Sequence, residues 1–221
     1  MRRMMATLLL AAVVPAQAEP VVAPDRQKLY AYLSGSDYID ALAKIGIYWD
    51  RTVLSRHTDC RSRYEVAPMT FGVLAPVQFD KNASQPRQGI WRQRFGLTRC
   101  GEQVIYNVLA IVHDGKLQLQ PQVPGDSRVA PVLLSQLLHE GVAARSARLE
   151  ESMGACPHTA VADTQVSLAP ADRVLAGQAA QNVWEERWTI KRCDSQFEMS
   201  FCFKQSPQGG IDWVPVACSM L

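Results

Sequence analysis

Residues 91–100 read WRQRFGLTRC, and residues 184–193 read WEERWTIKRC. The two segments align without a gap, four positions are identical, and two more exchange one large apolar side chain for another. A supersecondary unit that occurs twice explains this match better than coincidence does. The chain is therefore expected to contain two similar units.

Each copy of this motif belongs to a predicted series of strands. The first series is expected at residues 64–79, 88–99, 103–113 and 116–122. The second is expected at residues 159–168, 181–192, 196–204 and 211–217. Pro68 and Pro76 predict an edge or bulged strand at the start of the first series, and Asp114-Gly115 is a strong hairpin signal near its end.

Helical patterns precede both series, at residues 26–33, 36–46 and 132–149. Ser36 is the expected N-cap of the second pattern, and Gly46 marks its expected C-terminal boundary. Gly141 lies inside the last pattern and lowers its helix propensity. The predicted fold class is α+β, with two tandem repeats of a helix and a four-stranded antiparallel meander, stapled by disulfides. The repeats are placed at residues 25–128 and 129–221 and are expected to pack as one unit.

The N-terminus has the three parts of a secretory signal peptide. A short cationic start precedes an apolar run at residues 6–14, and residues 16–18 read AQA, as at a cleavage site. The run is shorter than the ~20 residues that a membrane-spanning helix needs, and a buried N-terminal helix is the alternative. We expect residues 1–18 to be removed, residues 19–24 to form a mobile leader, and the protein to reach the periplasm or be secreted without a membrane anchor.

The charge pattern gives no sign of a nucleic-acid partner. Residues 1–18 carry two arginines and no acidic residue, so their removal lowers the formal net charge from +2 to zero. A neutral surface with scattered charges has no electrostatic footprint for nucleic acid or an anionic membrane.

Six cysteines follow residue 18: Cys60, Cys100, Cys156, Cys193, Cys202 and Cys218. An even number in an exported protein predicts a disulfide framework. If the two units fold alike, the pairs are Cys60–Cys100, Cys156–Cys193 and Cys202–Cys218. A metal site is the alternative, but no C-x-x-C or mixed Cys/His spacing supports it, so no metal or cofactor is expected.

Strand alternation assigns the motif residues to two faces. Trp184, Glu186 and Trp188 share one face, which is expected to enter the core because of its bulk. Arg94 and Arg187 are the matched polar residues of the opposite face. They could bind an anion symmetrically, but a structural salt bridge or a position on the surface is the favoured interpretation.

No catalytic motif stands out in the sequence. His139-Glu140 begins like a zinc-protease motif but lacks the second histidine four residues later. His57, Asp59 and His158 lie near predicted disulfide cysteines, and a hydrolase site assembled from their loops is the alternative to a noncatalytic role.

The W-x-E-R-W-x(4)-C pattern at residues 184–193 resembles that of uncharacterised exported proteins of Gram-negative bacteria. In those proteins, one or two copies of such a motif and a following hairpin define a domain of unknown function. The first copy departs from the pattern at Gln93 and Phe95, and the second has Asp194 where glycine is usual. The matched positions look structural, so the resemblance implies no functional residues. The absence of a catalytic motif, the disulfides and the duplication favour a noncatalytic envelope protein that binds a partner protein or a small ligand. A periplasmic hydrolase is the alternative, and the sequence predicts no oligomeric state.

Overall fold

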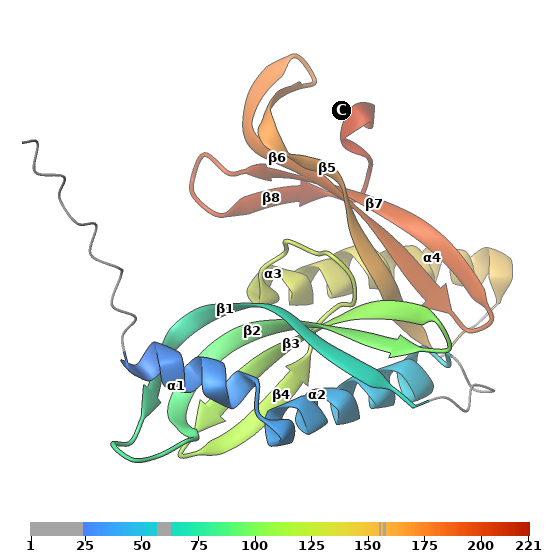
Figure 1. Cartoon of the computed structure of the whole chain (residues 1–221). Coiled ribbons are helices and arrows are strands. Elements are labelled where there is room, and N and C mark those ends of the chain that lie inside the picture. The colour runs from blue at the N-terminus through green and yellow to red at the C-terminus, as the bar shows by residue number, and fades with distance from the viewer. Residues whose placement is uncertain (1–23, 57–62, 155, 157) are drawn as a thin grey trace, which may run out of the picture.

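The computed structural model describes residues 24–56, 63–154, 156 and 158–221, and it contains two successive units (Figure 1). Each unit has helices followed by a four-stranded antiparallel sheet, in which strands adjacent in sequence are adjacent in space. The predicted α+β fold with two tandem repeats is confirmed. The predicted signal peptide and residues 19–23 of the leader lie outside the described residues, and Pro24 already belongs to the first helix.

Sheet 1 consists of β1 (Glu65–Phe79), β2 (Pro86–Arg99), β3 (Glu102–His113) and β4 (Lys116–Pro121). β1 is an edge strand whose pairing with β2 shifts register at four points, as its two prolines predicted. At the turn between β3 and β4, Asp114 has φ 48° and Gly115 has φ 74°. Both values are positive, as the predicted tight hairpin requires.

Sheet 2 consists of β5 (Thr159–Leu175), β6 (Gln178–Arg192), β7 (Ser195–Gln205) and β8 (Ile211–Val214). The two copies of the motif lie in β2 and β6, which are the second strands of their sheets. β8 is shorter than predicted and ends before Pro215, whose nitrogen cannot donate to a neighbouring strand.

The helices are α1 (Pro24–Leu33), α2 (Ser36–Tyr48) and η1 (Trp49–Val53) before sheet 1, and α3 (Pro131–Gln136), η2 (Leu137–Ala143) and α4 (Ala144–Met153) before sheet 2. The prediction that Ser36 caps α2 is wrong. Gly35 holds the N-cap position with φ −71° and ψ 146°, and no side chain caps the helix there. Ser36 is instead its first helical residue.

The prediction that α2 ends at Gly46 is also wrong, since the helix continues to Tyr48. The glycine instead permits close packing of the helix on the sheet. A Cβ atom at Gly46 would lie 2.9 Å from the ring of Phe95, and one at Gly141 would lie 2.7 Å from the ring of Phe201. Both glycines are buried in helical segments. Each glycine therefore lets its helix approach an aromatic ring of its own sheet, in β2 for Gly46 and in β7 for Gly141.

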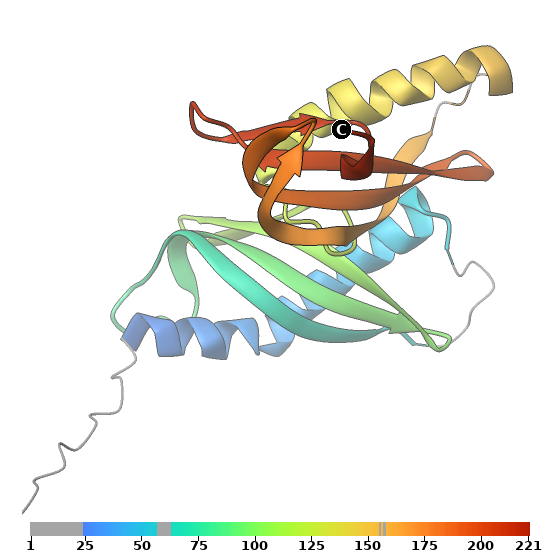
Figure 2. The same ribbon diagram turned by 90° about the horizontal axis from the view of Figure 1, so that it is seen from above.

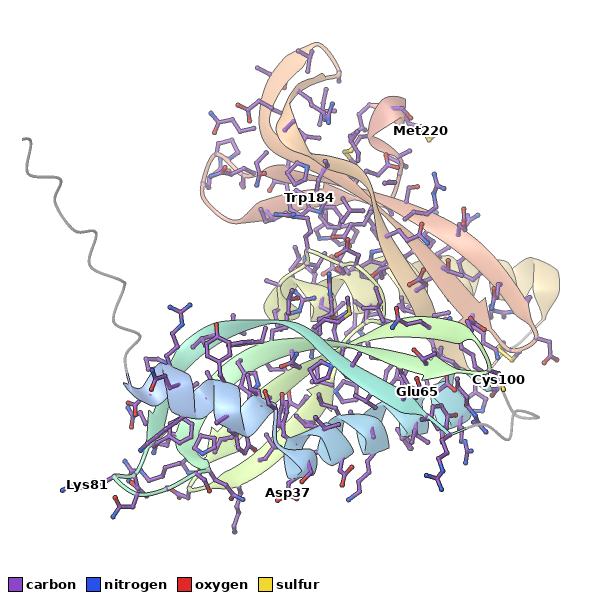
Figure 3. All side chains as sticks on the ribbon, viewed as in Figure 1. Asp37, Glu65, Lys81, Cys100, Trp184 and Met220 are labelled. Atoms are coloured by element: carbon purple, nitrogen blue, oxygen red, sulfur yellow. A yellow bond between two sulfur atoms is a disulfide. The ribbon has the colours of Figure 1, made fainter. Side chains whose placement is uncertain are left out.

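The core of each unit forms between these helices and the motif strand (Figure 3). Trp91 and Phe95 of β2 pack with Leu42, which lies four residues before Gly46. In unit 2, Trp184 and Trp188 of β6 pack with Leu137, which lies four residues before Gly141, and with Phe201. The expectation that the bulky face of the motif enters the core is confirmed.

Two of the predicted disulfides are present. Cys156 is bonded to Cys193, and Cys202 is bonded to Cys218. Cys100 is also a disulfide cysteine, but its predicted partner Cys60 lies outside the described residues.

The two units are stacked (Figures 1 and 2). In Figure 1, α2 lies below sheet 1, and α3 lies above it and next to sheet 2. Residues 122–130 connect the units and bond to both, since the Gly125 amide donates to Ile105 and the Asp126 amide donates to Thr164. Across the described ranges we find no helix with the length and hydropathy needed to cross a membrane.

Candidate functional site

The glutamate of the second motif holds two tryptophans in the core of unit 2. The side chain of Glu186 is fully buried. Its Oε1 accepts hydrogen bonds from Trp184 Nε1 at 3.2 Å and from the Arg128 backbone N at 2.7 Å, and its Oε2 accepts one from Trp188 Nε1 at 2.9 Å. Three N–H groups thus compensate the buried carboxylate, and bonds of this charge-assisted type are among the strongest in proteins.

In the first motif, the buried indole N–H is bonded to a neutral group instead of a carboxylate. Trp91 Nε1 donates to the Tyr38 hydroxyl at 2.9 Å. Phe95 replaces the second tryptophan, and its side chain has no hydrogen-bond donor. Gln93 takes the place of Glu186, and its amide donates to the carbonyls of Thr70 at 3.3 Å and Arg94 at 2.8 Å. The differences between the two copies therefore match the number of indole donors in each core.

Two arginines on the other face of β2 hold the connection between the units. Arg92 donates to the carbonyls of Ser127 at 3.2 Å and Val129 at 3.3 Å, and Arg94 pairs with Asp126 at 2.7 Å. Burial lowers the pKa of the Arg92 guanidinium, and the charge of Arg94 lowers it further. The nearby carboxylate of Glu186 raises this pKa and offsets part of the shift. These contacts fix residues 126–129 against sheet 1.

Arg187, the counterpart of Arg94, has a different environment. It lies on sheet 2 and faces Glu198 at 3.8 Å, with about half of its side chain exposed. The two arginines of the predicted anion site share no partner, and each has an acidic neighbour within the chain.

A second buried carboxylate lies at the end of the long helix of unit 1. Asp50 accepts hydrogen bonds from the hydroxyls of Tyr64 at 3.0 Å and Tyr106 at 3.1 Å, and Arg99 donates to Tyr64. Burial raises the pKa of Tyr106 above the ordinary tyrosine value, and the charge of Asp50 raises it further. The network ties η1 to β3.

The residues of the hydrolase alternative are not brought together in the part of the chain that the structure describes. His57 and Asp59 lie outside that part. His158 is exposed and lines a hollow of about 740 Å³ with Lys191 and Asp194, but Lys191 Nζ is bonded to the Leu54 carbonyl at 2.5 Å. No group of three metal-ligating side chains occurs among the described residues.

An apolar cleft of about 460 Å³ lies between α3 and sheet 2. Its walls include Leu133 of α3 and Val129 just before that helix. Pro170, Trp184 and Ile211 line it from the sheet. Trp184 stacks on Phe203 with ring centroids 4.7 Å apart, so its indole is held in place. A concave apolar surface with a fixed aromatic ring is typical of a binding site.

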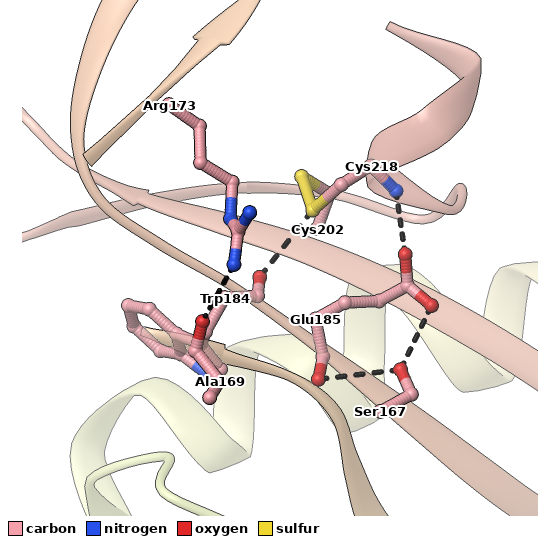
Figure 4. Close-up of a disulfide and its surroundings, with 7 residues drawn as sticks. All are labelled: Ser167, Ala169, Arg173, Trp184, Glu185, Cys202 and Cys218. Atoms are coloured by element: carbon pink, nitrogen blue, oxygen red, sulfur yellow. Dashed lines mark hydrogen bonds between the residues drawn. A yellow bond between two sulfur atoms is a disulfide. The ribbon is translucent and has the colours of Figure 1, made fainter. Parts of the chain in front are cut away.

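The strand that carries Trp184 is also fixed from its opposite face (Figure 4). Glu185 accepts hydrogen bonds from the Cys218 backbone N at 2.7 Å and from Ser167 Oγ at 2.8 Å. The disulfide between Cys202 and Cys218 joins the same C-terminal segment to β7. The cleft therefore rests on a rigid support.

The motif tryptophan lines the cleft in unit 2, whereas in unit 1 its counterpart Trp91 is in contact with α1. In unit 1, Tyr32 of α1 meets Trp91 edge-on at 6.2 Å, and Leu29 and Leu33 enter the same core. Unit 2 has no counterpart of α1 among its described residues, because the extended segment 122–130 leads directly into α3.

The helix residue beside the motif tryptophan differs between the two units. Tyr38 lies eight residues before Gly46 and is bonded to Trp91, whereas the residue eight positions before Gly141 is Leu133. Leu133 lines the cleft together with Trp184, of which 5% is exposed. The sequence contains this difference, but it can be recognised only once both helix residues are known to lie beside the motif tryptophan.

The rim of the cleft carries one cation and two amides. Arg128 is the only charged residue among the described residues that line the cleft, and its exposed guanidinium has no hydrogen bond or ion pair with the described part of the chain. Gln136 and Asn182 are the amides. The cleft therefore favours an apolar ligand that carries a negative charge.

Comparison with known proteins identifies no relative. No family model, curated protein or solved structure matches the chain.

Proposed function

We propose that this chain is an exported, noncatalytic protein of the bacterial cell envelope that binds a partner protein through the cleft at Trp184. Export is supported by the signal-peptide pattern of residues 1–18 and by the disulfides, which are typical of oxidising compartments. The cleft carries the binding proposal, because it combines a supported aromatic floor, apolar walls and an unpaired arginine.

The motif residues support a scaffold role beside this cleft. Glu186, Arg92 and Arg94 all bond within the chain and are engaged in holding the core or the connection between the units. The hydrolase alternative has less support, since we find no hydrogen bond between a histidine side chain and a hydroxyl or thiol among the described residues. His113 faces Asp114, and both side chains are largely exposed.

Site-specific photo-crosslinking in intact bacteria tests the proposal. A photoreactive phenylalanine replaces Gln136 at the rim of the cleft or, as a matched control, Arg187 on an exposed part of sheet 2. We expect one discrete adduct from position 136 in periplasmic material, none from position 187, and loss of the adduct when Leu133→Glu is added. Far-UV circular dichroism checks that this variant is folded.

Absence of an adduct at position 136 would overturn the proposal. Equal adducts from both positions would also overturn it, because nonspecific collisions would then explain the result.

A further inference from the structure

We infer that the cleft of unit 2 binds a short amphipathic helix of the partner protein, seated as α1 is seated on unit 1, with a carboxylate directed at Arg128. This inference rests on the proposed function and specifies the chemistry of the partner.

The chain itself shows how such a helix fits. α1 directs Leu29, Tyr32 and Leu33 into unit 1, a spacing of i, i+3 and i+4 that places all three on one helical face. The surface beneath α1 is formed by β1, by Trp91 of the motif strand and by α2. In unit 2 the cleft has the corresponding elements in its walls, with Pro170 of β5, Trp184 of β6 and Leu133 of α3. An apolar face with the spacing of α1 therefore has a matching surface on unit 2.

Charge selects among helices with this apolar spacing. Arg128 contributes a cation to the rim, and none of the described lining residues contributes an acid. Glu186 lies beneath the floor, but it is fully buried and already accepts three hydrogen bonds. An exposed ion pair contributes up to about 1 kcal/mol, which is roughly a fivefold change in affinity, so the carboxylate mainly sets orientation and specificity.

Three capped synthetic peptides of equal length test the inference with the full exported chain. All have an alanine- and glutamine-rich helical background. The first carries Leu-x-x-Tyr-Leu, as α1 does, with glutamates on the remaining face. The second has lysines in place of the glutamates, and the third keeps the composition of the first but disrupts the apolar spacing. Binding is followed by fluorescence anisotropy of labelled peptide.

We expect the acidic, correctly spaced peptide to bind at least tenfold more tightly than the peptide with disrupted spacing, and more tightly than the lysine peptide. Arg128→Gln should weaken its binding about three- to fivefold. Arg187→Gln is the matched control and should leave binding unchanged, since this arginine faces Glu198.

Leu133 provides the steric test. Leu133→Tyr introduces the side chain that unit 1 has at the equivalent position, fills the cleft, and should weaken binding at least tenfold while the protein stays folded. Leu133→Glu should do the same by placing a charge in the apolar wall.

Equal binding of the correctly spaced and disrupted peptides, or of the acidic and lysine peptides, would overturn the inference. Absence of any peptide binding while the adduct at position 136 persists would also overturn it and leave the proposed function standing. A dimer that Leu133→Glu dissociates in analytical ultracentrifugation would assign the cleft to a second copy of the chain instead.

Discussion

Replacement of Glu186 by glutamine tests how the motif stabilises unit 2. The amide oxygen can keep the bonds from Trp184 Nε1 and the Arg128 backbone N, but the amide NH₂ then faces Trp188 Nε1, and two donors oppose each other. The variant loses one hydrogen bond to a charged acceptor, ~1.5–3 kcal/mol, and leaves a buried donor unsatisfied, ~1–3 kcal/mol. Removal of the buried charge offsets part of this loss. We expect Glu186→Gln to lower the free energy of unfolding by about 2–3 kcal/mol.

A double-mutant cycle separates this cause from general disturbance of the core. Trp188→Phe removes the opposed donor, and the double variant then has the glutamine and phenylalanine that unit 1 has at the same motif positions. Glu186→Gln should therefore cost at least ~1 kcal/mol less in the Trp188→Phe background than in the wild type.

Urea unfolding followed by far-UV circular dichroism measures these free energies without relying on tryptophan emission. Glu198→Gln, at an exposed glutamate of the same sheet, is the control and should change the value by less than ~0.5 kcal/mol. An effect of Glu186→Gln below ~0.5 kcal/mol, or additive single effects in the cycle, would refute the proposed role of the carboxylate.

Two further predictions concern stability. Gly46→Ala and Gly141→Ala should each lower the free energy of unfolding by about 1–3 kcal/mol in urea titrations, because the added methyl group would press on Phe95 or Phe201; unchanged stability of either variant would contradict the close approach. Tyr106 has a raised pKa in the folded state, so its neutral form stabilises the fold fully at pH values below the pKa of an unfolded tyrosine, near 10. As the pH rises above that pKa, the free energy of unfolding falls by up to about 1.4 kcal/mol per pH unit. Tyr106→Phe should consequently lose less stability than wild type between pH 9 and pH 11, and parallel losses would contradict the assignment.

The sequence predicted those features that follow from local patterns. Alternation along residues 184–193 correctly placed Glu186 with Trp184 and Trp188 on the core face. The internal repeat correctly predicted two sheets with the motif in the second strand of each, and its paired use of cysteines correctly predicted Cys156–Cys193. These features depend on side-chain period and on symmetry, both of which can be read without a partner element.

The features that the sequence did not predict depend on contacts between elements. Glycine is typical of a helix end, yet α2 continues past Gly46 to Tyr48. The reason for a glycine there is its close approach to the ring of Phe95, which the sequence does not reveal. The cleft also escaped prediction. It depends on Leu133, which lies beside Trp184 as Tyr38 lies beside Trp91, and on the absence of a second α1 among the described residues. Neither feature is visible before the helices are placed on their sheets.

The acceptor of the motif tryptophan differs between the two units. Trp91 donates to the Tyr38 hydroxyl, so its acceptor comes from α2. Trp184 donates to Glu186 of its own strand, so the helix position is free to carry Leu133. Because its N–H is satisfied from within the strand, the indole can line a cleft without a polar group on the cleft side. A change of hydrogen-bond acceptor thus allows the apolar Leu133 to line the cleft of unit 2, whereas α2 of unit 1 carries the acceptor Tyr38.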